Sequence, residues 1–410
     1  MKKSISHRPL SISICLCLIL CGCITEYKAT GIDELSNIFV VEGVITDNET
    51  MITLSRSSKL SEVSLNNYPV TNAEVSVECD DGTQFRADRN YFYDEYSGIT
   101  YMGIYVITTG QLNLDRKYRL KIEIEEIDGD CVPDPVHPCP MKIYEYSSDY
   151  SYPIKTPEID SVFWIKKDRG QPVMIYVSTR DPENKNVHYR WSYKEDWEIN
   201  SEFWVDGYPF YCWSTDNSKN LLIGSAEKTV LGQLTDKVTE ISPSSRKFSV
   251  LYRIDIKQNA ISKRAYDYFA NIIKNSQQTG SIFAPIPSEL RGNIICTTDP
   301  DKAVIGYVDV STTTQKRRYI SNREVYESPY SNCRIYTKDE LCELLLGTCG
   351  NEDDIQCMEN WMKQCEELQI PSSMYIKADP MDTSLYVPVR CADCTYYGKT
   401  RKPDDWPNNH

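Results

Sequence analysis

The sequence predicts a mainly β protein with two antiparallel β-sandwich-like domains, one helix packed on the second domain, and a C-terminal cysteine-rich helical hairpin. Residues 38–128 and 156–325 contain many segments in which apolar and polar side chains alternate with a period of two, as in strands with one buried face. Within these ranges, residues 262–278 repeat apolar side chains at helical spacing. Twelve of the 16 cysteines follow residue 23, and an even number favours disulfides in an exported chain.

Composition excludes one class of function. The chain has 410 residues, with 45 Lys and Arg against 59 Asp and Glu, and a net charge of −14. A protein that binds nucleic acid through its own charge needs clustered cations and a positive field. With 40% hydrophobic and 25% charged residues, the composition is that of a globular protein.

The first 22 residues have the pattern of a lipoprotein signal peptide. A basic start precedes the apolar run 10–21, which is shorter than the roughly 20 residues that a spanning helix needs. Leu20-Cys-Gly-Cys23 resembles the bacterial lipobox. The resemblance implies that the chain is cleaved before Cys23, that Cys23 is acylated, and that residues 23–36 form a tether to the membrane.

Residues 37–128 form the predicted first β domain. Val75 and Val77 alternate with polar residues, and a turn follows at Asp80-Asp-Gly82. The order Val41-Glu-Gly43, Asn72-Ala-Glu-Val75, Gly103-Ile-Tyr105 and Tyr118-Arg-Leu120 resembles transthyretin-like or carboxypeptidase-regulatory-like sandwiches. Residues 129–155 are rich in Pro and Tyr and are predicted to be a linker, in which Cys131 and Cys139 can close a proline-rich loop.

Residues 156–325 form the predicted second β domain. Its most aromatic segment is an expected strand in which Tyr189, Trp191 and Tyr193 share one face and Arg190 lies on the other. Two interpretations are open: a ladder of core aromatics, or a platform on which a ligand stacks. The ligand-stacking candidates are Tyr189, Trp191, Tyr193 and Trp197.

The helix 262–278 has a capping residue at Ser262, and Gly280 follows its end. Its apolar stripe includes Tyr266, Phe269 and Ile272. We expect this stripe to pack on the sheet; a groove for a partner is the alternative.

Residues 326–410 carry the predicted helical hairpin and tail. Thr337-Lys-Asp-Glu340 is a capping-box pattern that opens a helix through Leu346, and a second helix is expected over 353–368. Cys342 and Cys349 lie on one face of the first helix, and Cys357 and Cys365 on one face of the second. Antiparallel helices would pair Cys342 with Cys365 and Cys349 with Cys357.

Cys391-Ala-Asp-Cys394 is a CxxC motif with three interpretations. It can supply disulfides, a zinc site with two other cysteines such as Cys296 and Cys333, or a redox pair. Disulfides are favoured, because zinc sites usually show two close pairs and no thioredoxin-like βαβ pattern precedes the motif.

The motifs together resemble one family. They are Tyr189-Arg-Trp191, Glu195-Asp-Trp-Glu198, Ser262-Lys-Arg-Ala-Tyr266, Gln278-Thr-Gly-Ser-Ile-Phe283, Arg291-Gly-Asn293, Asp299-Pro300, Gly306-Tyr-Val308, Cys391-Ala-Asp-Cys394 and Lys402-Pro-Asp-Asp-Trp406. This order is similar to that of the outer-membrane lipoproteins grouped as domain of unknown function 4249. The resemblance implies a lipid-anchored protein of the outer membrane, on its periplasmic face or at the cell surface. It also implies a TonB-dependent transporter as partner and an unknown small-molecule, peptide or glycan ligand.

Three functions remain open on the sequence alone. The first is a surface accessory that captures a ligand for a transporter; the second is a glycan-binding or adhesin-type protein. The third is an enzyme on a β scaffold, for which only Glu195 and Glu198 stand among aromatics. Because no nucleophile or phosphate-loop motif is present, we expect no catalytic residues, cofactor or metal.

Overall fold

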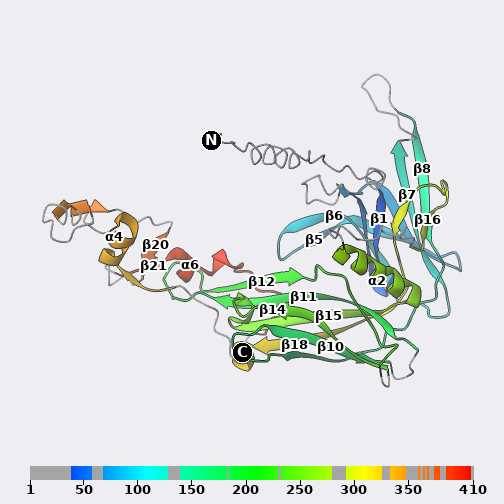
Figure 1. The fold of residues 1–410 in the computed structure, drawn as a ribbon. Helices are drawn as coiled ribbons and strands as arrows, with labels where there is room; N and C mark the ends of the chain where they lie inside the picture. Colours follow the sequence, from blue (N-terminus) through cyan, green and yellow to red (C-terminus); the bar gives the residue numbers. More distant parts are fainter. Residues whose placement is uncertain are drawn as a thin grey trace, which may run out of the picture.

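A computed structural model describes residues 38–57, 68–127, 139–278 (except 182, 184, 230 and 231), 292–325, 333–347, 359–360, 363–364, 367–368, 374–378 and 385–407. The protein is mainly β, as predicted, with several antiparallel sheets and few helices. The first domain lies above the second in Figure 1, and the C-terminal unit extends to one side.

The first domain is one curled sheet with the strand order β16-β8-β7-β4-β5-β6-β2-β1-β17 and a short β3 paired to β2. Neighbouring strands are antiparallel, except that β1 and β17 are parallel. The strands are β1 (Phe39–Gly43), β2 (Asn48–Arg56), β3 (Tyr68–Pro69), β4 (Ala73–Cys79), β5 (Gln84–Asp94), β6 (Ile99–Gly110), β7 (Tyr118–Ile127), β8 (Met141–Ser148), β16 (Ile294–Cys296) and β17 (Val304–Gly306).

The two end strands of this sheet meet and enclose its core. Asn293, which precedes β16, donates from Nδ2 to the Val308 carbonyl oxygen (2.8 Å) and accepts from the Val308 N–H (2.9 Å). A Cβ on Gly292 would lie 1.5 Å from the carbonyl oxygen of Gly306, so only glycine allows this approach. The enclosed core includes the predicted inward residues Val75 and Val77.

The second domain stacks two antiparallel sheets over a common core. The three-stranded sheet has the order β14-β10-β9, and the five-stranded sheet has the order β12-β11-β15-β18 with β13 paired to β11. The elements are β9 (Ile159–Ile165), β10 (Val173–Arg180), β11 (His188–Asn200), β12 (Tyr211–Asn217), β13 (Leu222–Ser225), β14 (Gln233–Ile241), η3 (Arg246–Phe248), β15 (Leu251–Ala260), β18 (Thr313–Ser321) and α3 (Asn322–Val325).

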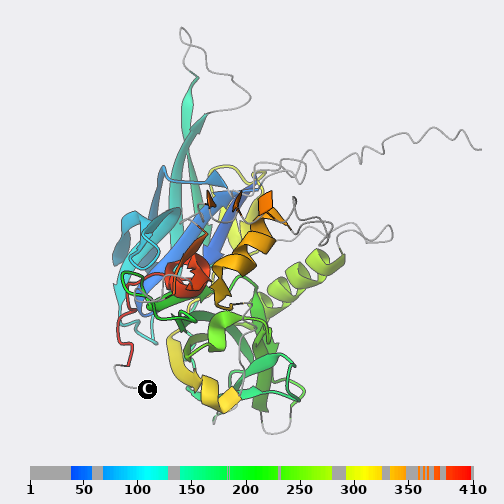
Figure 2. The ribbon, with the colours of Figure 1, turned by 90° about the vertical axis from the view of Figure 1, so that its left-hand side faces the viewer.

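Helix α2 (Lys263–Gln278) forms where the sequence predicts it. The Ser262 hydroxyl accepts a hydrogen bond from the Ala265 N–H (3.1 Å), as expected of a capping residue. Its buried face, which includes Tyr268 and Phe269, packs against Tyr307 from the segment after β17. The helix therefore lies where the two domains meet, as the perpendicular views in Figures 1 and 2 show.

The C-terminal unit contains β19 (Tyr336–Thr337), α4 (Lys338–Leu346), β20 (Tyr375–Lys377), β21 (Leu385–Pro388), α6 (Val389–Ala392) and η4 (Cys394–Tyr396). The predicted capping box at α4 is present, with the Thr337 side chain on the Glu340 N–H and the Glu340 carboxylate on the Thr337 N–H. The three strands form a small sheet in the order β19-β21-β20, which the sequence did not predict. Most of the expected second helix, 353–368, lies outside the described residues.

Two predicted domain boundaries are wrong. Residues 141–148 are predicted to lie in a linker but form β8, which pairs with β7 from Met141 to Ser147. Strands β16 and β17 were expected in the second domain but complete the first sheet. Strands β16 and β17 pair with strands that lie far away in the sequence, and a local pattern does not report such partners. Strand β8 pairs with the preceding strand β7 and is missed from the sequence because its segment is rich in Tyr and follows a proline-rich stretch.

The cysteines pair differently from the simplest expectation. Cys394 is bonded to Cys212 on β12, and Cys391 is bonded to Cys333, so the CxxC cysteines form disulfides but not with each other. Cys333 therefore cannot serve the alternative zinc site, and Cys296 is a buried free thiol in the first sheet, as is Cys79.

Each of the remaining predicted disulfides includes at least one cysteine that lies outside the described residues. Cys139 is disulfide-bonded, and its predicted partner Cys131 lies outside them. Cys342 is buried in α4, whereas Cys349, Cys357 and Cys365 lie outside them, so the nested hairpin pairing stays a prediction.

Replacing Asn293 by Ala should lower the free energy of unfolding by about 2–4 kcal/mol, because two buried backbone groups of Val308 lose their partners. Urea denaturation measures the change. Asn72→Ala, which removes an exposed hydrogen bond to the Glu125 carbonyl, is the matched control and should cost less than about 1 kcal/mol. Equal losses in the two variants would contradict the closing role of Asn293.

Peptide mapping without reductant should recover the Cys212–Cys394 and Cys333–Cys391 linkages, because their Cα atoms lie 5.6 and 5.8 Å apart. Cys79 and Cys296 should react with iodoacetamide only after denaturation, since both thiols are buried. A linked Cys391–Cys394 peptide would contradict the fold of the C-terminal unit.

Candidate functional site

The two β domains meet at a polar junction made of residues 45–47, 154–157, 259–262 and 309–313. The Asn259 side chain donates to the Thr312 carbonyl (3.2 Å) and the Thr313 hydroxyl (2.8 Å). The Thr156 hydroxyl accepts from the Ala260 N–H (2.9 Å), and the backbone of Ile45 bonds to that of Asp309 and Ser311. The bonds that cross between the domains are those of residues 45–47: besides Ile45, the Thr46 hydroxyl bonds to the Thr313 hydroxyl (2.6 Å), and Asp47 accepts from the Thr313 N–H (2.9 Å). Because these groups are buried or partly buried, separating the domains would leave them without partners.

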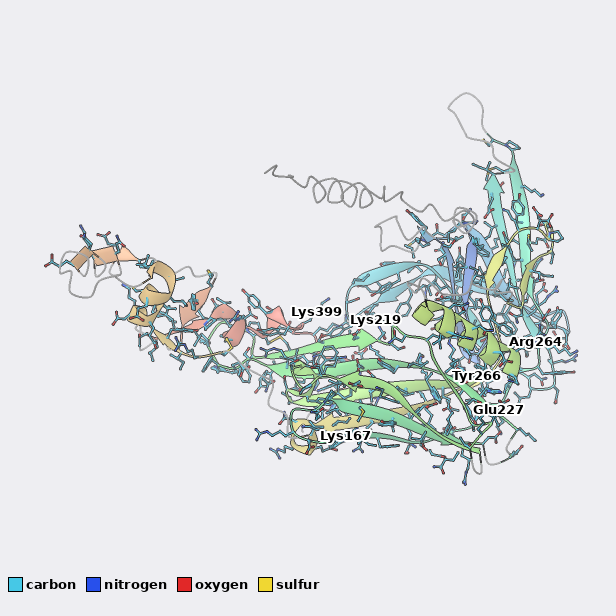
Figure 3. The ribbon with its side chains drawn as sticks, in the orientation of Figure 1. Lys167, Lys219, Glu227, Arg264, Tyr266 and Lys399 are labelled. Carbon is cyan, nitrogen blue, oxygen red and sulfur yellow. A yellow bond between two sulfur atoms is a disulfide. The ribbon has the colours of Figure 1, made fainter. Side chains whose placement is uncertain are left out.

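A second contact, the clasp, joins the tip of the β5–β6 hairpin to β12 and the C-terminal tail. The Lys399 ammonium donates to the carbonyls of Tyr96 (3.2 Å) and Ser97 (2.6 Å), and the Tyr96 hydroxyl donates to the Trp213 carbonyl. Arg401 forms an ion pair with Glu95 at 3.0 Å. In Figure 3, Lys399 and Lys219 lie along the edge of the second domain that faces the hairpin.

A cleft lies between strands β1 and β17 of the first domain and the outer face of the five-stranded sheet. It consists of two adjoining hollows of about 370 and 450 Å³, which share Gly43, Arg190, Trp191 and Ser192. Tyr268, Phe269 and Ile272 of α2 line the smaller hollow. Small-ligand sites are usually concave, largely apolar and located between domains, so this cleft is the candidate site.

A third hollow, of about 340 Å³, lies over β4, β5 and β7 of the first sheet. Its charged side chains already pair with one another: Arg86 with Glu74 at 3.8 Å, and Lys121 with Glu123 at 2.8 Å. This hollow therefore has fewer unpaired charged groups available to a ligand than the cleft has.

Arg190 is the central charge of the cleft and lines both hollows. Its guanidinium carbon lies 5.1 Å from the ring centroid of Phe269. Burial lowers the pKa of Arg190, and the nearby carboxylate of Glu42 acts in the opposite direction. Period two places Arg190 opposite Tyr189 and Trp191 from sequence alone, but nothing local indicates that the first domain faces it.

The predicted ligand-stacking row is wrong at Tyr189 and Trp191. Their exposed fractions are 0% and 3%, and both belong to the core of the second domain, which was the alternative interpretation. The Trp191 indole N–H donates to Gln258 at 2.8 Å, which satisfies its one polar atom. Tyr193 and Trp197 are half-buried against the same core.

The two glutamates that are the catalytic candidates of the sequence, Glu195 and Glu198, form structural hydrogen bonds and ion pairs. Glu195 accepts from the Tyr252 hydroxyl at 2.5 Å and forms an ion pair with Lys247, whereas Glu198 accepts from the Trp406 indole at 3.0 Å. An odd spacing on a strand places the two glutamates on opposite faces of the sheet. They therefore do not form a pair that could flank one substrate bond.

The buried carboxylate of Asp196 anchors the tail. It accepts two hydrogen bonds from Arg253, at 3.1 and 2.6 Å, and Arg253 also donates to the Asp404 carbonyl at 3.1 Å. The Arg253 guanidinium lies over the Trp406 ring, 5.3 Å from its centroid. The Lys402–Trp406 motif thus packs on β11 and β15, where it has a structural role.

A buried carboxylate also fixes the start of α2 beside the cleft. Asp309 accepts from the Ser262 N–H (2.8 Å) and the Ser262 hydroxyl (3.1 Å). Burial raises the pKa of Asp309 above its ordinary value, although these bonds and Arg264 act to lower it. Nearby, His188 stacks on Tyr266 with centroids 4.6 Å apart and lies 3.3 Å from Glu227, and burial lowers the pKa of His188. Tyr266, Glu227 and Arg264 are labelled around α2 in Figure 3.

Within the described parts of the chain, no three His, Cys, Asp or Glu side chains gather as metal ligands. Over the same residues, no helix has the length and apolarity needed to cross a bilayer.

The fold and the cleft define a class: a disulfide-containing, two-domain β protein with a candidate binding site between its domains. The model of the domain of unknown function DUF4249 matches residues 24–132 and 141–317, so the chain belongs to this family, as the sequence motifs indicated. The match does not include 318–410, which carry the CxxC motif and the docked tail. A search of curated proteins finds no match.

Replacing Asp309 by Asn should flatten the pH dependence of stability in the acidic range. Because the folded protein holds this proton more tightly than the unfolded chain, whose pKa is near 3.8, the stabilisation is full below pH 3.8 and is lost as pH rises through the folded pKa. Urea unfolding at a series of pH values tests this. Asp168→Asn, on an exposed turn, is the control; an Asp309→Asn profile parallel to the wild type would contradict the assignment.

Proposed function

We propose that this protein is an outer-membrane lipoprotein that captures a ligand in the cleft between its two β domains and serves as an accessory of a TonB-dependent transporter. The cleft carries the proposal. Both domains contribute to it, and the junction and the clasp hold its two walls together.

The N-terminus supports the membrane part of the proposal. Leu20-Cys-Gly-Cys23 follows an apolar run with a basic start, and the family match begins at residue 24. Acyl chains on Cys23 supply about 0.8 kcal/mol for each buried CH₂ group, and two or more chains make a stable anchor. The disulfides of the C-terminal unit are consistent with a position outside the cytosol.

A glycan-binding or adhesin-type function is the second candidate, and one observation favours it. Tyr91 and Tyr93 on β5 are 42% and 50% exposed, and their spacing places them on one face of the strand. Met102, paired with Tyr91, is 47% exposed on the same face. Exposed rings in a row provide apolar surface on which sugars stack.

Cys23→Ala should move the protein from the membrane fraction to the released fraction, because the acylated sulfur is lost. Cys21→Ala is the matched control and should stay with the membrane. Fractionation with immunodetection measures both, and continued anchoring of Cys23→Ala would contradict lipidation at this residue.

The same preparations test the transporter partner. A large β-barrel protein should co-purify with the wild type from outer membranes in mild detergent. Its absence from the wild-type preparation, with the lipoprotein itself intact, would contradict the accessory function and leave the glycan-binding function as the better candidate.

A further inference from the structure

Arg190 brings a positive charge into the cleft that the described residues do not neutralise. Over the described part of the chain, its guanidinium takes part in no ion pair within 4.0 Å and no hydrogen bond, and it contacts the Phe269 ring. None of its nitrogens is among the buried polar atoms without a partner, so the nitrogens reach the open space of the cleft. A half-buried charge without a partner is costly, and a ligand of opposite charge would remove that cost.

The surroundings of Arg190 are apolar on one side and open on the other. Phe269 lies under the guanidinium, and Tyr268, Leu221 and Ile305 line the same hollow. Its volume of about 370 Å³ suits a small ligand rather than a folded partner. A guanidinium presents parallel donors that match the two oxygens of a carboxylate.

The other charges of the cleft leave Arg190 available. Asp47 accepts from the Thr313 N–H at 2.9 Å, and Glu49 forms an ion pair with Arg89 at 3.7 Å. Lys219, at the rim, is paired with Asp216 at 3.3 Å. Glu42 is the acid whose field reaches Arg190, yet it is exposed on β1 and forms no contact with Arg190 within ion-pair distance.

We propose that Arg190 binds the carboxylate of a small ligand whose apolar body lies against Phe269 and Tyr268 in the cleft. This assignment rests on the proposed ligand-capture function and names the chemistry of its ligand. The protein as a whole is strongly acidic, with a net charge of −14, so attraction of an anion depends on the local cations of the cleft. Arg190 lines both hollows, whereas Lys219 and Lys257 each line one.

Binding of 3-phenylpropionate to the full-length protein in detergent, measured by saturation-transfer NMR and calorimetry, tests the proposal. The acid should bind, and its neutral amide, 3-phenylpropionamide, should bind about 10- to 100-fold more weakly, because the charge-assisted hydrogen bonds are lost. Phenyl phosphate tests whether the site distinguishes a carboxylate from a phosphate. Equal binding of acid and amide, stronger binding of the phosphate than of the acid, or no binding of the acid at millimolar concentration would overturn the proposal.

Variants separate the charge from the fold. Arg190→Gln should weaken binding of the acid about 10- to 100-fold and leave the amide unchanged, and Arg190→Lys should restore part of the affinity. Arg86→Gln, on the exposed surface of the first domain, is the matched control and should bind like the wild type. Glu42→Gln should bind the acid more tightly, because a competing negative charge is removed. Unchanged binding in Arg190→Gln, with a native circular dichroism spectrum, would overturn the proposal.

The outcome is distinguishable from failure of the proposed function. If the wild type co-purifies with a β-barrel but does not prefer the acid, the accessory function stands and the carboxylate assignment falls. If it prefers the acid through Arg190 but has no barrel partner, the site stands and the transporter function falls.

Discussion

The polar junction between the domains is the constraint on which the rest of the structure depends. Residues 45–47 of the first domain bond to residues 309–313, and Asn259 and Thr156 of the second domain hold residues 311–313 in turn. A buried donor or acceptor that loses its partner costs about 1–3 kcal/mol, so these segments can part only at considerable cost. The junction therefore holds β1 and β17 over the outer face of β11, and that placement creates the cleft.

Helix α2 links the junction to the site. Its first turn is held by Asp309 and Ser262 at the junction, and its middle carries Tyr268 and Phe269 into the cleft. The position of Phe269, which lies under Arg190, therefore depends on how the junction places the start of the helix. A ligand that bound Arg190 and Phe269 together would contact both domains, since Ile305 and Glu42 complete the hollow from the first domain.

The C-terminal residues also hold the two β domains together, at the clasp rather than at the junction. The tail docks through Arg253 and Trp406, Lys399 and Arg401 reach the hairpin of the first domain, and Cys394 is bonded to Cys212. Crosslinks and ion pairs between residues so far apart in sequence restrict the unfolded chain and the opening of the domains. The family model ends at residue 317, so in this chain the clasp involves residues beyond the matched part.

The sequence by itself determined the mainly β class, the helix 263–278 and the capped helix at 338, because alternation, helical spacing and caps are local. The tertiary structure alone decided that β8, β16 and β17 complete the first sheet, that Cys391 and Cys394 bond to different partners, and that Tyr189 and Trp191 face the core. Alternation assigns side chains to two faces of a strand but does not say which face another domain covers. Arg190 became a candidate for binding only when the first domain was placed opposite it.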